Sequence, residues 1–335
     1  MIRSEGFALV LVLWVLSLLT IMAGSFALSM RREAAIVTGS SINAQAMAVA
    51  ESGLALAELM IMNPDLRQRW LTDGSIYQID YVDSKVRVRL LSEAGKIDIN
   101  RADQILLQGL MASAPVEPQL QTKLVNAILD WRDADDLVHI DGAEKNEYKA
   151  AGLSYKPRNK AFQSIEELRM VLGMDKEVFK WLENLVTVYS GQSQVDLTQA
   201  TKEVLQVLPG IDAGLIDQYI ALRRESAING LPAPAFPVAS TQGIESGQDV
   251  IENTSDTAVN DGTEQKGAVT VVTEALLDDG TKAIIHALIK KSTNPGSPPF
   301  QVLKWQRDTA GDGSLFTDEK EDLLVRQYAE PEFNN

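Results

Sequence analysis

The feature that most constrains this chain is a run of 24 residues without a charged side chain, from Phe7 to Met30. Thirteen of the residues between Phe7 and Leu28 are Leu, Val, Ile or Phe. A helix of about 20 apolar residues spans the hydrocarbon core of a bilayer, and these side chains favour insertion by roughly 6 kcal/mol in total. The run therefore predicts one membrane-spanning helix near the start of the chain.

The residues that flank the run distinguish several kinds of membrane segment. A secretory signal has a basic start, a shorter apolar core and a small-residue cleavage site after it. Here the start is of mixed charge, and Arg31 and Arg32 close the run without an Ala-x-Ala pattern. A small residue stands before the run instead, so a cut between Gly6 and Phe7 would leave the apolar helix on the mature chain. A plain single-pass anchor and an ordinary signal peptide are the competing interpretations.

Beyond Arg32 the sequence continues as a helix of a different kind. Apolar and small residues recur every three or four positions, which is the period of an amphipathic helix. They are Ile42, Ala46, Val49, Gly53, Leu54, Ala57 and Ile61. Pro64 ends the pattern. We expect one helix from Phe7 to about Met62, lipid-facing in its first half and packed on a folded domain in its second.

Two stretches of alternating apolar residues predict a sheet built from distant parts of the chain. Residues 75–91 form a predicted hairpin with a turn at Asp83-Ser84. Alternation returns after Gly267, with two strands around a turn at residues 278–281 and a further strand at residues 300–305. We expect the late strands to join the hairpin, so that the region between them is an insertion in one sheet domain.

Residues 96–224 are predicted to be helical and contain a weak internal repeat. Residues 97–102 (IDINRA) reappear as residues 195–200 (VDLTQA), with Asn100 and Thr198 as expected helix N-caps. The second copy continues into a pattern that resembles a helix-hairpin-helix unit, whose hairpin amides can bind a phosphate. DNA binding is therefore an alternative. Three basic against five acidic residues between Val195 and Glu225 disfavour it.

The segment most like a binding site is residues 130–147, which holds seven carboxylates around a turn at Gly142. Hard oxygen ligands without Cys or a nearby pair of His suit Ca²⁺ better than Zn²⁺, although the order of the residues is not that of an EF-hand. The candidate ligands are Asp133, Asp135, Asp136 and Glu144.

Two other interpretations of these carboxylates remain. One is a solvated acidic loop in which Asp130 bonds to the backbone or to Arg132. The other is a calcium-dependent hydrolase, which is disfavoured because no nucleophile motif lies beside the carboxylates.

Composition narrows the classes of function. The net charge of −15 does not favour a nucleic-acid partner, and a chain with no Cys has neither disulfide nor thiolate chemistry. Its two histidines, His139 and His286, lie far apart and outside any recognisable catalytic motif, so we predict no enzyme. Residues 229–267, rich in Pro, Gly, Ser, Asn and Asp, are predicted to be a mobile surface insertion.

Taken together, these features resemble type IV pilin-like proteins and, within them, the minor pseudopilin K family of the bacterial type II secretion system. The resemblance is carried by Gly6-Phe7 before the apolar helix, by its amphipathic continuation, and by motifs at residues 96–102, 130–136 and 141–144. It implies cleavage after Gly6 by a prepilin peptidase, methylation of the new amine on Phe7, and a structural Ca²⁺ ion.

The resemblance also implies a cellular location and a set of partner proteins. The chain would be an inner-membrane, single-pass protein with a periplasmic C-terminal domain. It would sit at the tip of the pseudopilus, where it initiates or caps assembly and supports export of folded proteins across the outer membrane. Its partners would be the I-type and J-type minor pseudopilins and the major pseudopilin. A membrane-anchored DNA-binding receptor is the alternative from another class.

Leu11 is a departure from the pilin-like pattern. Most such chains carry Glu at the fifth mature position, where this chain has Leu11. A buried Glu costs free energy unless it meets a cation, which in the fibre is taken to be the N-terminal amine of the subunit above. A subunit at the tip has none above it, so Leu11 fits a tip position. The alternative is that Leu11 merely faces lipid in a protein that joins no fibre.

The predicted fold class is α+β, with a pilin-like long N-terminal helix packed on a small antiparallel sheet. A large all-helical domain with helix-hairpin-helix or SAM-like units interrupts the sheet. The predicted parts are a leader at 1–6, the membrane half of the helix at 7–30, its amphipathic half with the first strands at 31–95, the helical insertion at 96–228, the flexible insertion at 229–267, and the returning strands with an acidic tail at 268–335.

Overall fold

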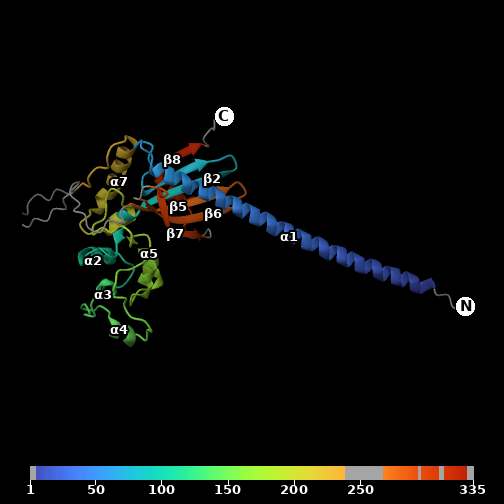
Figure 1. Ribbon diagram of the computed structural model, residues 1–335, viewed down its shortest axis with the longest axis horizontal. Helices are drawn as coiled ribbons and strands as arrows, with labels where there is room; N and C mark the ends of the chain where they lie inside the picture. Colours follow the sequence, from blue (N-terminus) through green and yellow to red (C-terminus); the bar gives the residue numbers. More distant parts are fainter. Residues whose placement is uncertain (1–4, 238–266, 293–295, 309–312, 330–335) are drawn as a thin grey trace, which may run out of the picture.

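The computed structural model describes residues 5–237, 267–292, 296–308 and 313–329. A long helix lies with its C-terminal part along a sheet and projects beyond the sheet with its N-terminal part (Figure 1). A region of short helices lies beside the same sheet (Figure 1). The predicted α+β class, with its long N-terminal helix and helical insertion, is confirmed.

Helix α1 (Glu5–Ile61) is continuous over 57 residues. Its C-terminal part meets the sheet through small side chains, and a Cβ added to Gly53 would come within 2.7 Å of Val86 Cγ1. The helix residues buried there, besides Gly53, are Ala46, Ala50, Leu54 and Ala57. Along the N-terminal part, large apolar side chains such as Leu13 and Trp14 are exposed. Within the described residues, this is the one helix long and apolar enough to cross a membrane.

The sheet has six strands in the order β7-β6-β5-β2-β1-β8. The hairpin predicted at residues 75–91 is confirmed, and so is the return of the late strands, because β5 pairs with β2 along its length. The strands are β1 (Asp73–Asp80), β2 (Ser84–Ser92), β5 (Ala268–Leu277), β6 (Lys282–Lys291), β7 (Phe300–Asp308) and β8 (Leu324–Ala329).

The sheet differs from the predicted one at its C-terminal edge. Strand β8 pairs with β1 in parallel, so the sheet is mixed rather than antiparallel. The acidic tail therefore contributes an edge strand, preceded by a 3₁₀ helix at Asp318–Leu323. The predicted flexible insertion lies largely outside the described residues. Its first part, residues 229–237, forms no regular secondary structure.

The helical insertion has a hydrophobic core separate from the one under α1. It begins with β3 (Ile97–Asp98), which pairs in parallel with β4 (Val186–Thr187). Its α-helices are α2 (Gln104–Ala112), α3 (Pro118–Arg132), α4 (Lys145–Ala150), α5 (Lys176–Leu182), α6 (Lys202–Val207) and α7 (Ala213–Ile228). Trp131 lies in this core, where it is buried and stacks on Phe162 with ring centroids 5.9 Å apart.

A buried carboxylate joins the insertion to the sheet. Glu93 follows β2 and is 3% exposed. Its Oε1 accepts hydrogen bonds from Lys96 Nζ (2.8 Å) and from Thr270 Oγ1 in β5 (2.6 Å). Its Oε2 accepts a bond from Thr187 Oγ1 in β4. Because these donors come from both regions, Glu93 fixes the insertion against the sheet.

Candidate functional site

The acidic segment predicted as a cation site begins at the end of α3 and returns over it. Asp130 and Asp133 are three residues apart, so they lie on the same side of the helix end. The returning loop is held by Asn126, whose Nδ2 donates to Ile140 O at 2.7 Å. Gly142 passes so close that an added Cβ would lie 2.1 Å from Asp130 Oδ2. The turn at this position therefore requires a glycine.

Asp130 is fully buried and organises the loop through hydrogen bonds. Its Oδ1 accepts bonds from the backbone N of His139 at 3.1 Å and from His139 Nδ1. Its Oδ2 accepts a bond from the backbone N of Ala143 at 2.6 Å. The expected backbone bonding of Asp130 is thus present. Arg132 donates to two backbone carbonyls of the 97–102 segment, those of Ile99 and Ala102.

The four predicted ligands fall into two pairs. Asp133 Oδ1 and both carboxylate oxygens of Glu144 are buried and have no well-formed hydrogen bond among the described residues, although the Glu144 carboxylate lies against backbone amides at the start of α4. The other two carboxylates already accept bonds: Asp135 Oδ1 from Leu137 N at 2.8 Å, and Asp136 Oδ1 from Asn159 Nδ2 at 3.1 Å. Asp133 and Glu144 therefore have the greater need of a cation, because a buried acceptor without a partner is costly.

The carboxylates of the loop influence one another electrostatically. Only Asp133 of the four predicted ligands belongs to the group whose ligand atoms lie within 4.8 Å of one another, which is Asp130, Asp133 and His139 among the described residues. Burial raises the pKa of Glu144 to about 7, and the negative charges of Asp130, Asp133 and Asp136 contribute to the rise. The pKa of Asp133 is also raised, first by burial and then by Asp135 and Asp130, with His139 acting in the opposite direction. Negative charge is thus concentrated around two buried carboxylates, Asp130 and Glu144, at the edge of an exposed loop, and such a concentration favours a bound cation.

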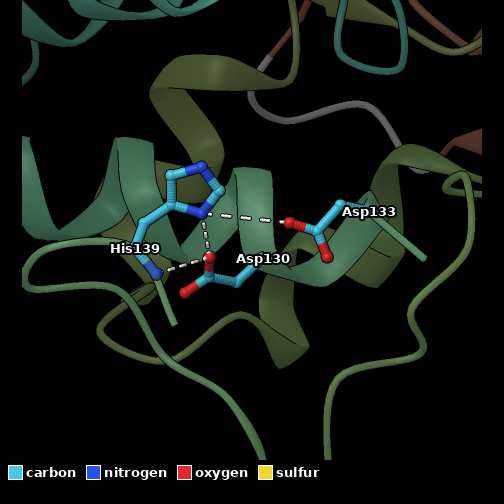
Figure 2. A group of neighbouring side chains, drawn as sticks. All are labelled: Asp130, Asp133 and His139. Carbon is cyan, nitrogen blue, oxygen red and sulfur yellow. Dashed lines mark hydrogen bonds and ion pairs between the residues drawn. The ribbon is translucent and has the colours of Figure 1, made fainter. Parts of the chain in front are cut away.

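Two residues of this cluster were missed by sequence reasoning. His139 Nδ1 lies between Asp130 Oδ1 and Asp133 Oδ2, and its distance to the latter is 3.8 Å (Figure 2). Asn159 joins from another loop, where its φ is 51° and its Oδ1 is buried without a hydrogen-bond partner in the described part of the chain. A carboxamide 26 residues beyond Asp133 carries no sequence signal, whereas His139 lies inside the acidic segment itself.

At the N-terminal end, the residues of the predicted processing site lie within α1. Gly6 and Phe7 are in its first turns, after Glu5 where the helix begins. The side chain of Leu11 is 53% exposed, in a row of similarly exposed apolar residues. A helix surface of this kind suits lipid or other apolar helices, so both interpretations of Leu11 remain compatible with it.

The unit that resembles a helix-hairpin-helix has little capacity for phosphate. The carboxylate of Asp212 accepts a bond from Gly214 N at 2.8 Å and so occupies the N-terminus of α7, where a phosphate would bind. Of the basic residues, Lys202 pairs with Asp217 at 2.5 Å, and Arg223 is buried beside Asp73 at 3.1 Å. The geometry thus gives the DNA-binding alternative no support.

The chain is similar in sequence to proteins of the type II secretion system. Residues 85–191 match the family model described as type II secretion system (T2SS), protein K. Type II secretion system protein K of Pseudomonas aeruginosa is 25% identical over 248 residues, which is 66% of this chain and 72% of that protein. The K protein of Klebsiella pneumoniae is 24% identical over 201 residues, covering 54% of this chain and 61% of that protein.

The chain is thus similar to the K proteins of the type II secretion system over the matched residues. A solved structure has a fold similar to that of this chain. It is the GspK-GspI-GspJ complex of the enterotoxigenic Escherichia coli type 2 secretion system, matched with a TM-score of 0.50 at 16% identity over 82% of this chain and 99% of that chain. The K-family match spans both the acidic segment and the 97–102 motif.

Proposed function

We propose that this K-family chain is a non-enzymatic minor pseudopilin that works at the tip of the type II secretion pseudopilus. There it initiates or caps assembly and so supports export of folded proteins across the outer membrane. The observation that carries the proposal is the pairing of a K-family match at residues 85–191 with a 57-residue helix whose N-terminal part is apolar and exposed. Such a helix can leave the bilayer and enter a bundle of apolar helices, because its apolar side chains are kept from water by lipid in the one place and by other helices in the other.

The proposed partners are the I-type and J-type minor pseudopilins and the major pseudopilin. The matched solved structure is a complex of K, I and J proteins, which supports an equivalent assembly here. The long α1 would anchor the chain in the inner membrane, with the sheet and the helical insertion in the periplasm. The insertion adds bulk beside the sheet, and bulk on the outermost subunit would prevent another subunit from stacking above it.

Processing by a prepilin peptidase is the step that tests the proposal first. Cleavage would follow Gly6 and methylation would modify the amine of Phe7. Mass spectrometry of the mature N-terminus, in membranes with and without the peptidase, should find methylated Phe7 only when the peptidase is present. An intact Met1 in both, or a cut near residue 30, would contradict the assignment as a pseudopilin.

We further propose that the acidic cluster binds a structural Ca²⁺ ion. The buried oxygens of Asp133, Glu144 and Asn159 that lack a well-formed hydrogen bond are hard donors of the kind that Ca²⁺ takes in sets of six to eight. Asp135 and Asp136 stay among the proposed ligands, since each keeps a second carboxylate oxygen. A bound Ca²⁺ would neutralise the cluster and hold the loop to α3.

The test of the ion is calcium-dependent thermal stability of the full chain in detergent. Ca²⁺ should raise the melting temperature of the wild type, and Asp133→Asn or Glu144→Gln should remove most of that increase. Asp141→Asn is the matched control, because Asp141 is an exposed carboxylate of the same loop and its positive φ of 60° suits Asn equally well. Equal responses in all three variants would contradict the site.

A further inference from the structure

Strand β7 forms one edge of the sheet and has two different faces. On one face, Lys304 forms an ion pair with Glu166 of the helical insertion. On the other face, Val302 and Trp305 pair with residues of β6 that belong to the core under α1. Although they continue that core, Val302 is 47% exposed and Trp305 is 39% exposed. An apolar strip thus continues beyond the area that α1 covers.

Strands β6 and β7, which carry this apolar strip, are also unusual in their charge. Residues 282–307 hold five Lys or Arg and no acidic residue, within a chain of net charge −15. Lys282 and Lys304 are used in ion pairs with Glu274 and Glu166. Lys291 and Arg307 have no ion pair in the described parts of the chain, and their partners in the register place them on the same face as Trp305. We call Val302, Trp305, Lys291 and Arg307 the edge strip.

The spacing of the strands indicates what shape fits the edge strip. Helix α1 lies over β5 and its two neighbours, and it contacts β5 more than it contacts β6 or β2. Strand β7 is two strands from β5, which is about 9.6 Å at the usual separation of strands. Two packed helices have their axes 8–10 Å apart. A second helix laid over β7 would therefore touch both α1 and the edge strip.

Pairing of a foreign strand with the edge is the alternative, and the backbone of β7 disfavours it. The register with β6 slips between Val302 and Lys304, so Leu303 is an extra residue that forms a bulge. Bulges and charged residues on an edge strand are features that discourage strand addition. What β7 offers to a partner is therefore a face of side chains rather than a ladder of hydrogen bonds.

We propose that the edge strip is the docking surface for the long N-terminal helix of another pilin-like chain, through a helix face that carries apolar and acidic side chains. The apolar side chains would cover Val302 and Trp305, and the acidic ones would meet Lys291 and Arg307. The inference rests on the proposed function, because it takes for granted that such helices surround this chain. What the inference adds to that function is the surface of the sheet on which one such helix docks.

The test starts from the tagged full chain, isolated in detergent from cells that express the whole secretion system. The pilin-like chains recovered with it are quantified by mass spectrometry. The variant Val302→Glu with Trp305→Glu should recover at least tenfold less of one such chain. Val82→Glu is the matched control and should recover the wild-type amount, because Val82 is 80% exposed in the turn between β1 and β2. Equal melting temperatures would show that both variants fold.

The outcomes separate this inference from the function on which it rests. If the wild-type chain recovers no pilin-like chain, the proposed function fails. If the wild type and the edge-strip variant recover equal amounts, the inference fails while the function stands.

A photo-cross-linking amino acid in place of Trp305 keeps the inference testable if the double variant does not fold. Cross-linked peptides from a partner's long N-terminal helix would support it. Peptides from a second copy of this chain, or from a partner's sheet, would overturn it.

Discussion

Arg132 and Arg223 occupy equivalent positions in two copies of one helical unit. Arg132, at the end of α3, donates to the carbonyls of Ile99 and Ala102. Arg223, in α7, donates to the carbonyls of Leu197 and Ala200, which are the residues aligned with Ile99 and Ala102 in the sequence repeat. Each unit thus consists of an extended segment, two helices and an arginine that ties the second helix to the segment. The weak sequence repeat is therefore a structural duplication.

The two arginines should differ in their contribution to stability. Loss of the hydrogen bonds of a charged donor costs about 1.5–3 kcal/mol, so Arg132→Met should lower the free energy of unfolding by roughly that amount. Arg223 in addition pairs with Asp73, whose side chain is 9% exposed. Arg223→Met removes that partner and leaves Asp73 with the hydrogen bonds from Ser75 and the charge of Arg89, so the cost should exceed that of Arg132→Met and reach at most about 3–5 kcal/mol. Denaturant unfolding of the detergent-solubilised chain measures both. An equal loss in the two variants would contradict the ranking.

A second prediction concerns the contact of α1 with the sheet. Gly53→Ala should destabilise the chain by about 1–3 kcal/mol, because the new Cβ would lie 2.7 Å from Val86 Cγ1 and force the helix away from β2. Gly39→Ala is the control in the same helix. Nothing lies within 4 Å of its added Cβ, and Ala favours a helix over Gly by up to about 1 kcal/mol. Thermal unfolding should thus shift in opposite directions, and a shift of the same sign would refute the argument.

The sequence was sufficient for α1 and for most of the sheet because both depend on local periodicity. The small and apolar residues spaced every three or four positions are the ones buried against the strands, and alternation located β1, β2, β5 and β6. Strand β8 could not be found in this way. Its place is decided by pairing with β1, more than 240 residues earlier, and its own segment is short and follows an acidic stretch.

The two predicted helix caps are wrong, because polar side chains near a helix start have several possible hydrogen-bond partners. Asn100 and Thr198 were expected to cap helices, but the caps are Asp103 for α2 and Thr201 for α6, three residues later in both copies. The side chain of Asn100 instead bonds to the backbone of Phe162, and Thr198 Oγ1 donates to Asp196 Oδ1 at 2.6 Å. The repeat was thus recognised correctly, while its internal hydrogen bonds depend on neighbours that the sequence does not reveal.

The acidic cluster was predictable only in part, for a related reason. Composition located the loop, yet the contributions of His139 and Asn159 depend on how the chain returns over the end of α3. A cluster formed by one continuous segment can be found from its spacing. A member that arrives from a separate loop, as Asn159 does, cannot.

A third prediction follows from the close passage of Gly142. Gly142→Ala should disrupt the cluster, because its Cβ would lie 2.1 Å from Asp130 Oδ2, and Asp130 holds the loop. The stabilisation by Ca²⁺ should then be largely lost. Gly313→Ala is the control, since nothing lies within 4 Å of its added Cβ. Melting temperatures with and without Ca²⁺ measure the effect. A full response to Ca²⁺ in the Gly142 variant would show that the loop tolerates the change.

A fourth prediction is that stability without calcium falls as the pH rises. The pKa of Glu144 is about 7 in the folded chain, because of burial and the charges of Asp130, Asp133 and Asp136, and its ordinary value is 4.5. Between these two values the folded chain binds more protons at this site than the unfolded chain does. The free energy of unfolding therefore decreases as the pH rises through that window.

Melting temperatures in a chelator at several pH values from 5 to 8 measure this dependence. The wild type should lose stability steadily over that range, and Glu144→Gln, which has no proton to lose, should show a smaller slope. Asp141→Asn should keep the wild-type slope, because Asp141 is exposed. In the proposed site Ca²⁺ would compete with the proton for the Glu144 carboxylate, so the stabilisation by Ca²⁺ should be larger at pH 8 than at pH 5. Equal slopes in the wild type and Glu144→Gln would mean that the pKa of Glu144 is not raised in the folded chain.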